Sequence, residues 1–122
     1  MSDQSVPSVV VADDDVDLRM LVEIKLRQSG FEVHAVDNGV DALAAIRGLR
    51  PDLAVLDVTM PGMSGPEVLA AVRADDALGS CRVLLLTGRD LDDALTDLAD
   101  DYLAKPFSPR ELVVRAQALA LD

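Results

Sequence analysis

The stretch Leu53-Ala54-Val55-Leu56-Asp57 is an apolar run that ends in a carboxylate, and Thr59-Met60-Pro61-Gly62 follows it. A short apolar run of this kind is typical of a β-strand that is buried on both faces, as the strands of parallel sheets are. The pattern of an apolar run followed by a polar or charged residue recurs along the chain. Three more fragments carry it: Ala12-Asp13-Asp14-Asp15, Leu86-Thr87-Gly88 and Tyr102-Leu103-Ala104-Lys105-Pro106-Phe107.

Helical signals separate these runs and divide the chain into five strand–helix pairs. We expect strands over five ranges: Ser8 to Ala12, Phe31 to Val36, Leu53 to Leu56, Val83 to Leu86 and Tyr102 to Ala104. Asp15 and Asp17 are expected to cap the first helix, which stops at Ser29-Gly30, and Ser108 is expected to cap the last helix, with Pro109 in its first turn. The alternation predicts a doubly wound α/β fold with a five-stranded parallel sheet of the flavodoxin-like order.

In such a fold the carboxyl ends of the strands share one edge of the sheet, and ligands bind there. The carboxylates of Asp13, Asp14 and Asp57, the hydroxyl of Thr87 and the ammonium of Lys105 would then converge. Mg²⁺ favours a few carboxylate oxygens together with water and phosphate oxygens. A carboxylate can attack phosphorus with metal assistance, while an ammonium and a hydroxyl can bind phosphoryl oxygens. These residue types therefore predict a site for a hard cation and a phosphoryl group, with Asp57 as the nucleophile.

Length, composition and charge indicate one domain with an aliphatic core. We expect residues 1–122 to form a single domain with a loose lead-in over 1–7, and the aromatic share of 2% leaves the core to Val, Leu, Ile and Ala. The apolar runs are far shorter than the ~20 residues of a membrane span, the first residues lack the basic and then apolar pattern of a signal peptide, and Cys81 is the single cysteine. These features predict a cytoplasmic protein without a membrane partner. The net charge of −11 argues against direct nucleic-acid binding by this chain.

Taken together, the four fragments resemble the receiver domain of bacterial two-component response regulators, and the match runs from Val9 to about Leu121. The resemblance implies the same fold and makes Asp57 the phosphoacceptor. It also implies a Mg²⁺ ion, for which Mn²⁺ can substitute. The ion would be bound by four groups: the carboxylates of Asp13, Asp14 and Asp57 and the backbone carbonyl of Thr59.

The resemblance further implies that Thr87 and Lys105 contact the phosphoryl group. Tyr102 would occupy the aromatic switch position of the family, where a ring can change its exposure as the threonine hydroxyl moves toward phosphate. The phosphoryl donor would be the phosphohistidine of a histidine kinase or of a phosphotransfer protein. The domain would control a C-terminal output domain or a separate effector, and it would be an enzyme only toward its own phosphorylation and dephosphorylation. The resemblance also allows a dimer that forms on phosphorylation.

Three other functions fit the sequence less well. A metal-dependent phosphatase acting on small phosphate esters needs a general acid, usually two residues after the nucleophile, and Thr59 stands at that position. A flavin-binding module would need aromatic side chains for stacking, and the chain has no tryptophan. A degenerate receiver that binds partners without phosphate would lack part of the residue set, which is complete here.

Two local features lead to further expectations. The segment between Thr87 and Lys105 is shorter than in the family by about one helical turn, ~3.6 residues. We therefore expect a short fourth helix over Leu91 to Leu98 that is poorly protected and changes on activation. Because the chain must turn back toward the acidic edge directly after a strand, we also predict a cis peptide bond between Lys105 and Pro106.

Overall fold

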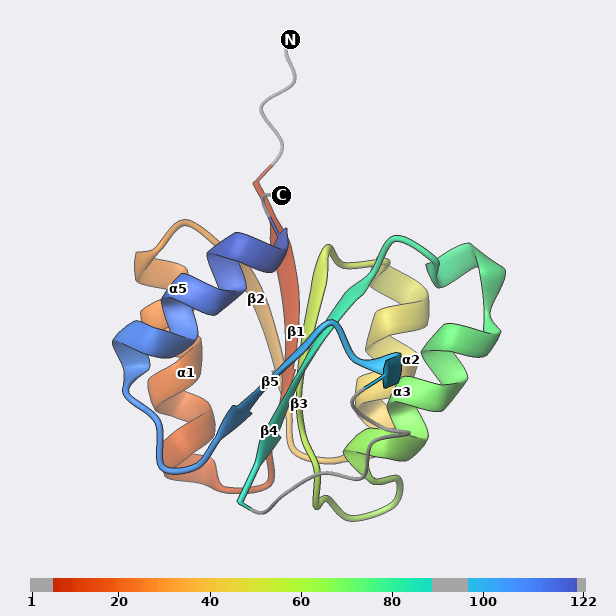
Figure 1. Cartoon of the computed structure of the whole chain (residues 1–122), viewed down its shortest axis with the longest axis horizontal. Coiled ribbons are helices and arrows are strands. Elements are labelled where there is room, and N and C mark those ends of the chain that lie inside the picture. Colours follow the sequence, from red (N-terminus) through yellow and green to blue (C-terminus); the bar gives the residue numbers. More distant parts are fainter. Residues whose placement is uncertain (1–5, 89–96, 121–122) are drawn as a thin grey trace, which may run out of the picture.

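The computed structural model describes residues 6–88 and 97–120, and within them five parallel strands form one sheet (Figure 1). The strands are β1 (Ser8–Ala12), β2 (Glu32–Val36), β3 (Leu53–Asp57), β4 (Arg82–Thr87) and β5 (Asp101–Ala104). Their order in the sheet is β2-β1-β3-β4-β5, and every neighbouring pair is parallel. The flavodoxin-like order expected from the sequence is therefore confirmed.

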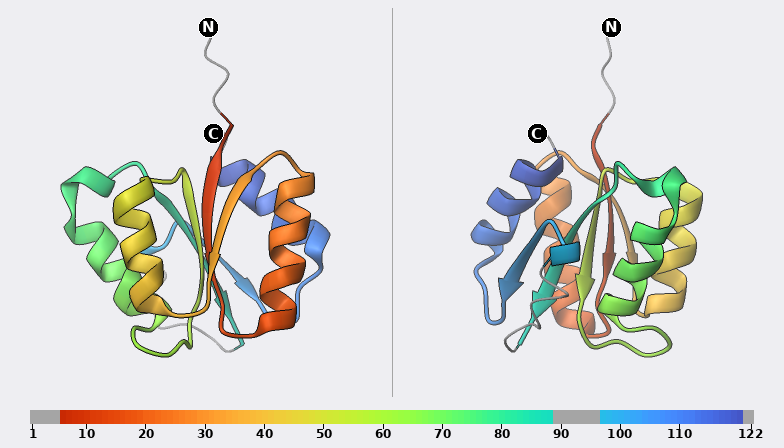
Figure 2. Two further views of the ribbon diagram at one scale, coloured as in Figure 1. Left: turned by 180° about the vertical axis from the view of Figure 1, so that it is seen from behind. Right: turned by 45° about the vertical axis from the view of Figure 1, so that its right-hand side comes forward.

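Helices cover both faces of this sheet (Figures 1 and 2). One face carries α1 (Val16–Gln28) and α5 (Pro109–Ala120), and the other carries α2 (Gly39–Leu49) and α3 (Gly65–Ala74). A short 3₁₀ turn, Asp76–Leu78, leads from α3 toward β4. The fourth helix expected over 91–98 falls for the most part on residues 89–96, which lie outside the described residues. The same is true of residues 1–5 of the expected lead-in, whereas the carbonyl of Pro7 already accepts a hydrogen bond from Glu32 at 2.9 Å.

The core consists of two aliphatic layers, because the central strands are buried on both faces. Val10 and Leu85 belong to the layer against α2 and α3, whereas Val9 and Leu84, their neighbours along the same strands, belong to the layer against α1 and α5. All four side chains are at most 1% exposed. This double burial fixes the strands laterally, and it thereby fixes the residues at their carboxyl ends. No helix in the described part of the chain is long and apolar enough to span a membrane.

Polar side chains cap the helices at or near the edge of the sheet where the strands end. Asp15 accepts hydrogen bonds from the amides of Asp17 and Leu18, both at 3.1 Å, so its expected capping role is confirmed. Ser108 caps α5 by accepting a bond from the amide of Glu111 at 3.0 Å. These caps fix where α1 and α5 begin relative to the acidic loop after β1 and the loop after β5. The peptide between Lys105 and Pro106 is cis, as the sequence predicts.

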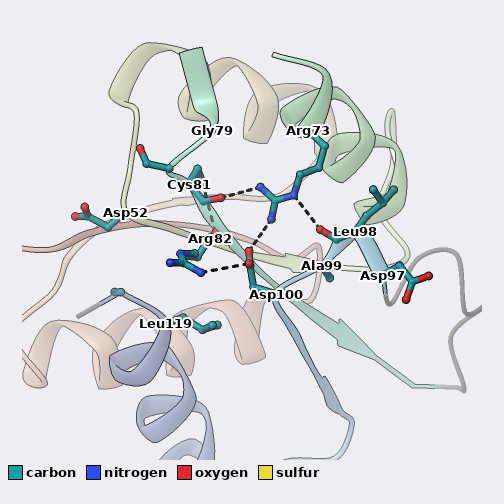
Figure 3. Close-up of a pocket in the computed structure, with 12 residues that line it drawn as sticks. Asp52, Arg73, Gly79, Cys81, Arg82, Asp97, Leu98, Ala99, Asp100 and Leu119 are labelled. Carbon is teal, nitrogen blue, oxygen red and sulfur yellow. Dashed lines mark hydrogen bonds and ion pairs between the residues drawn. The ribbon is translucent and has the colours of Figure 1, made fainter. Parts of the chain in front are cut away.

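The opposite edge of the sheet is held by a charged network around Arg73, which lies in the last turn of α3 (Figure 3). Its guanidinium donates to the carbonyls of Leu98 and Cys81, each at 2.9 Å, and to the carboxylate of Asp100 at 2.6 Å. The same carboxylate accepts the amide of Val83 at 2.7 Å. A cavity of about 540 Å³ lies beside this network. Arg73 therefore ties α3 to the amino ends of both β4 and β5.

Replacing Arg73 by alanine is expected to lower the free energy of unfolding by about 2–3 kcal/mol, since three acceptors lose a charged, largely buried donor. Arg47→Ala is the matched control, because among the described residues Arg47 makes only an exposed ion pair to Asp75 at 4.0 Å, and such pairs contribute about 0–1 kcal/mol. Urea unfolding of both variants measures the difference. Equal losses of unfolding free energy in the two variants would show that the Arg73 network stabilises the fold no more than an exposed ion pair does.

Candidate functional site

Three carboxylates meet at the carboxyl ends of β1 and β3. Oxygens of Asp13, Asp14 and Asp57 all lie within 4.8 Å of one another. Asp57 is the last residue of β3, while Asp13 and Asp14 directly follow β1, which is hydrogen-bonded to β3. Asp13 is 1% exposed and Asp57 is 7% exposed, whereas Asp14 is exposed to solvent. The acidic cluster predicted from the sequence is therefore present, with one carboxylate facing outward.

Lys105, the first residue after β5, is the only cationic side chain that forms an ion pair with this cluster within the described residues. Its Nζ lies 3.2 Å from Oδ1 of Asp57 and 3.4 Å from Oδ2 of Asp13. The side chain is 27% exposed, so the ammonium remains within reach of solvent. One ammonium against three carboxylates leaves an excess of negative charge at the site.

The charge balance shifts the pKa of Asp57 upward. Burial of the carboxyl raises its pKa most, and the neighbouring charge of Asp13 raises it further. Lys105 lowers it through its charge and its hydrogen bond, but this effect does not outweigh the first two. The ionised form of Asp57 is thus held at a free-energy cost in the absence of a cation.

The pKa of Lys105 is raised for the complementary reason. Burial of the ammonium acts to lower its pKa and is the largest single influence, but the charges of Asp13 and Asp57 and their hydrogen bonds together outweigh it. Lys105 therefore stays protonated throughout the physiological pH range. A fixed positive charge beside Asp57 is what an incoming anion requires.

The remaining residues singled out from the sequence lie around this cluster. Thr87 is the last residue of β4 and is 4% exposed; its carbonyl accepts the amide of Lys105 at 2.7 Å. Leu86, its neighbour, is the register partner of Asp57. Thr59 lies in the exposed loop after β3. Tyr102 lies in β5 opposite Leu85 and is 49% exposed.

Two contacts of the site's backbone were not foreseen from the sequence. Arg19 of α1 donates from Nη1 to the carbonyl of Asp13 at 2.9 Å. Gly65, at the start of α3, donates its amide to Val58 at 3.0 Å, and a Cβ at Gly65 would collide with the carbonyl oxygen of Asp57. Neither contact has a sequence signal, because both depend on how a helix is placed against a loop.

The donor set fits a hard divalent cation. It consists of oxygen atoms only, from carboxylates on two adjacent strands, and one of them faces solvent where water ligands have access. A cation would also relieve the repulsion among the three acids. Mg²⁺, which keeps several waters and binds few protein carboxylates, suits this arrangement.

Comparison with known proteins identifies relatives. A family model, the response regulator receiver domain, matches residues 9–117. The DNA-binding response regulator MtrA of Mycolicibacterium paratuberculosis is 43% identical over 113 residues, which is 90% of this chain and 49% of that protein. The transcriptional regulatory protein PrrA of Mycobacterium leprae is 44% identical over 119 residues, covering 94% of this chain and 50% of that protein. The chain thus spans about half the length of these relatives.

Solved structures agree with the fold. The chemotaxis response regulator CheY4 of Vibrio cholerae superposes with a TM-score of 0.87 at 30% identity, covering 94% of this chain and 99% of that one. The response regulator TrrA of Thermotoga maritima, solved in complex with Mg²⁺-BeF, gives a TM-score of 0.84 at 31% identity and covers 93% of this chain and 98% of that one. Both similarities extend over nearly the whole chain.

The relatives correct the expectation that nucleic acid is not a partner. MtrA is named as a DNA-binding response regulator and PrrA as a transcriptional regulatory protein. The expectation rested on the net charge of −11, which is a property of this chain, and this chain matches only about half of each relative. Repulsion between this part and DNA leaves the other half of such a protein free to bind it, so the charge does not exclude nucleic acid.

The raised pKa of Asp57 predicts how stability depends on pH in metal-free buffer. Between the ordinary value of 3.8 and the raised value, the native state keeps a proton that the unfolded chain has lost, so stability falls as pH rises through this window. Asp57→Asn removes the charge and is therefore expected to raise the free energy of unfolding at neutral pH. The gain should disappear below the ordinary carboxyl pKa, where Asp57 is protonated in both states.

Thermal unfolding in the presence of a chelator, repeated across this pH range, measures the effect. Asp52→Asn is the matched control, because Asp52 precedes the opposite end of the same strand and its carboxylate accepts the amide of Ser8 at 2.9 Å, away from the acidic cluster. It is expected to give no gain at neutral pH. An Asp57→Asn variant that is no more stable than the wild type at neutral pH would contradict the prediction.

Proposed function

We propose that this chain, which belongs to the response regulator receiver family of two-component signalling systems, accepts a phosphoryl group on Asp57 and changes conformation as a result. The observation that carries the proposal is the position of Asp57 between two further carboxylates and the ammonium of Lys105 at 3.2 Å. Asp57 is then the nucleophile, and the groups around it manage the charge of the incoming phosphoryl group.

In the proposed uptake step, a carboxylate oxygen of Asp57 forms a bond to the phosphorus of a phosphohistidine. The bond between phosphorus and the imidazole nitrogen breaks, its electron pair stays on that nitrogen, and the neutral imidazole results. A separate step ends the signal. Water attacks the phosphorus of the acyl phosphate, which releases inorganic phosphate and regenerates the carboxylate of Asp57. The chain acts as an enzyme only on itself.

Asp13, Asp14 and Asp57 would hold Mg²⁺, with the backbone carbonyl of Thr59 as a further ligand, and Mn²⁺ could replace it. The bound ion supplies positive charge to the phosphoryl oxygens as they approach a cluster of carboxylates. The chain's own contribution is the arrangement of the acids. Asp13 is fixed by burial and by accepting the amide of Asp15 at 2.9 Å, whereas Asp14 is exposed.

Lys105 and Thr87 would respond to the new charge. Phosphorylation adds up to two negative charges, and Lys105, which stands between Asp13 and Asp57, can turn its ammonium to a phosphoryl oxygen. The Thr87 hydroxyl would donate a hydrogen bond to another phosphoryl oxygen. The hydrogen bond from the Lys105 amide to the Thr87 carbonyl, at 2.7 Å, supports a joint movement of the ends of β4 and β5.

Tyr102 would carry this movement to the surface. It is paired with Leu85, two residues before Thr87, and its half-exposed ring gives it room to move between two positions. The next residue on its amino side, Asp101, binds Arg115 of α5 through both carboxylate oxygens at 3.0 Å. A shift of β5 is therefore expected to reach α5, which makes these two elements the surface that an output domain or separate effector would detect. We expect the protein to act in the cytoplasm, where its kinase would present phosphohistidine.

Incubation with acetyl phosphate and Mg²⁺ is expected to add one phosphoryl group, on Asp57, because a small donor reaches the same carboxylate without a kinase. Intact-mass spectrometry measures the uptake. Asp57→Asn should abolish it, while Asp52→Asn, which changes the acid before the other end of β3, should leave it intact. Labelling that survives in Asp57→Asn, or that continues when Mg²⁺ is chelated, would refute the proposal.

Mg²⁺ is also expected to stabilise the fold, since it binds the native arrangement of acids and not the unfolded chain. A concentration of one hundred times the dissociation constant contributes about 2.7 kcal/mol. Asp14→Asn should lose most of this gain. Asp37→Asn should keep it, because Asp37 is a nearby acid that lies outside the cluster and accepts a bond from Asn38 at 2.8 Å. Melting temperatures with and without Mg²⁺ compare the three proteins, and equal gains in all of them would count against the acidic cluster as the metal site.

A further inference from the structure

The first turn of α2 presses directly on the loop that follows β3. Gly39, the first residue of α2, is buried and donates its amide to the carbonyl of Pro61 at 3.2 Å. A Cβ at Gly39 would collide with the carbonyl oxygen of Met63 and would lie 2.7 Å from the Met63 Cβ. Only a glycine leaves the room that this approach needs. Figure 2 shows the start of α2 beside this loop at the lower edge of the molecule.

The loop is also held at its other end. Gly65 donates to the carbonyl of Val58 at 3.0 Å, and a Cβ there would meet the Asp57 carbonyl. In between, Gly62 has a φ of +79°, and a Cβ on it would lie 3.0 Å from a methyl group of Val40. The loop is thus confined between the starts of α2 and α3. A displacement at Met63 cannot be absorbed at Gly65, so it passes back toward Thr59.

The confined loop matters for the acidic cluster because it directly follows Asp57 and contains Thr59. Asp57 ends β3, and Thr59 lies between Asp57 and Pro61, whose carbonyl Gly39 binds. Mg²⁺ requires near-ideal octahedral geometry, so a shift of the loop backbone changes cation binding even when every ligand residue is retained. A hollow of about 470 Å³ borders the loop and Asp14, so within the described part of the chain this side of the loop is open to such a shift.

We propose that Gly39 is a positioning residue of the cation site, which sets the place of the loop from Val58 to Ser64 relative to Asp13 and Asp57. The inference rests on the proposed function, because it takes the acidic cluster to bind Mg²⁺ or Mn²⁺. Gly39 touches none of the reacting atoms and acts only through the loop. Its role follows from the close approach of α2 and not from any side chain.

Gly39→Ala tests the inference, and Gly48→Ala is its matched control. Gly48 lies in the same helix, is exposed, and would place its Cβ in open space. The measurement is Mn²⁺ affinity, from the loss of the free-ion electron paramagnetic resonance signal, at a temperature where each variant is folded. Gly39→Ala is expected to weaken Mn²⁺ binding about tenfold or more, the range typical of changes behind the ligands of a metal. Gly48→Ala should bind Mn²⁺ like the wild type.

The outcomes separate this inference from the proposed function. If the wild type and Gly48→Ala bind Mn²⁺ and Gly39→Ala binds it equally well, Gly39 has no positioning role, whatever its effect on stability. If the wild type itself binds no Mn²⁺, the proposed cation site fails. Loss of binding confined to Gly39→Ala supports both.

A second measurement on the wild type keeps the inference testable if Gly39→Ala does not fold. Coupling between two sites is reciprocal, so a loop contact that favours cation binding must in turn be stabilised by the cation. Mg²⁺ is therefore expected to slow hydrogen exchange of the Gly39 amide at least severalfold, while the Gly48 amide changes little. Exchange of the Gly39 amide that ignores Mg²⁺ would overturn the proposal.

Discussion

The organisation of this protein depends on keeping like charges close together. Oxygens of Asp13, Asp14 and Asp57 lie within 4.8 Å of one another, and the ammonium of Lys105 is shared between two of the acids. The acids are held together because they lie at the ends of β1 and β3, which are hydrogen-bonded neighbours. Aliphatic side chains pack against both faces of these strands. The core therefore offsets an electrostatic cost at the edge of the sheet, and a cation or a proton is what relieves it.

The two edges of the sheet differ in how their charged side chains are balanced. At the amino edge, Asp100 is bonded to Arg73 and to the amide of Val83, so its charge is matched and its geometry is fixed. At the carboxyl edge, the acids exceed the bases among the residues that the structure describes, and Asp14 faces solvent. Strands that are anchored at one end and electrostatically unbalanced at the other can transmit a local change in charge as a movement of their free ends. This asymmetry suits a switch better than a rigid scaffold.

The positions of several candidate residues in the fold could be predicted from the sequence because of a rule of parallel sheets. Asp57 and Thr87 end β3 and β4, and Lys105 directly follows β5, so their positions after apolar runs assigned all three to one edge without coordinates. Contacts between a helix and a loop give no such signal: neither Gly39 against Met63 nor Arg73 against Asp100 follows from spacing or composition. The charge of −11 gave a wrong expectation about nucleic acid for a different reason. It is a property of this chain, whereas the DNA binding named for MtrA belongs to a protein about twice as long.

Lys105 joins the charge of the site to the framework of the sheet. Its ammonium interacts with Asp13 and Asp57, while its amide donates to Thr87 at 2.7 Å, so one residue responds to the site and also pairs with β4. Under the proposed function, a phosphoryl group at Asp57 competes for that ammonium and draws the backbone of Lys105 with it. Tyr102, three residues before Lys105, is half exposed and offers a large side chain of β5 that a partner can contact. The path from charge to surface therefore needs only a single short strand, and no longer chain of contacts has to be invoked.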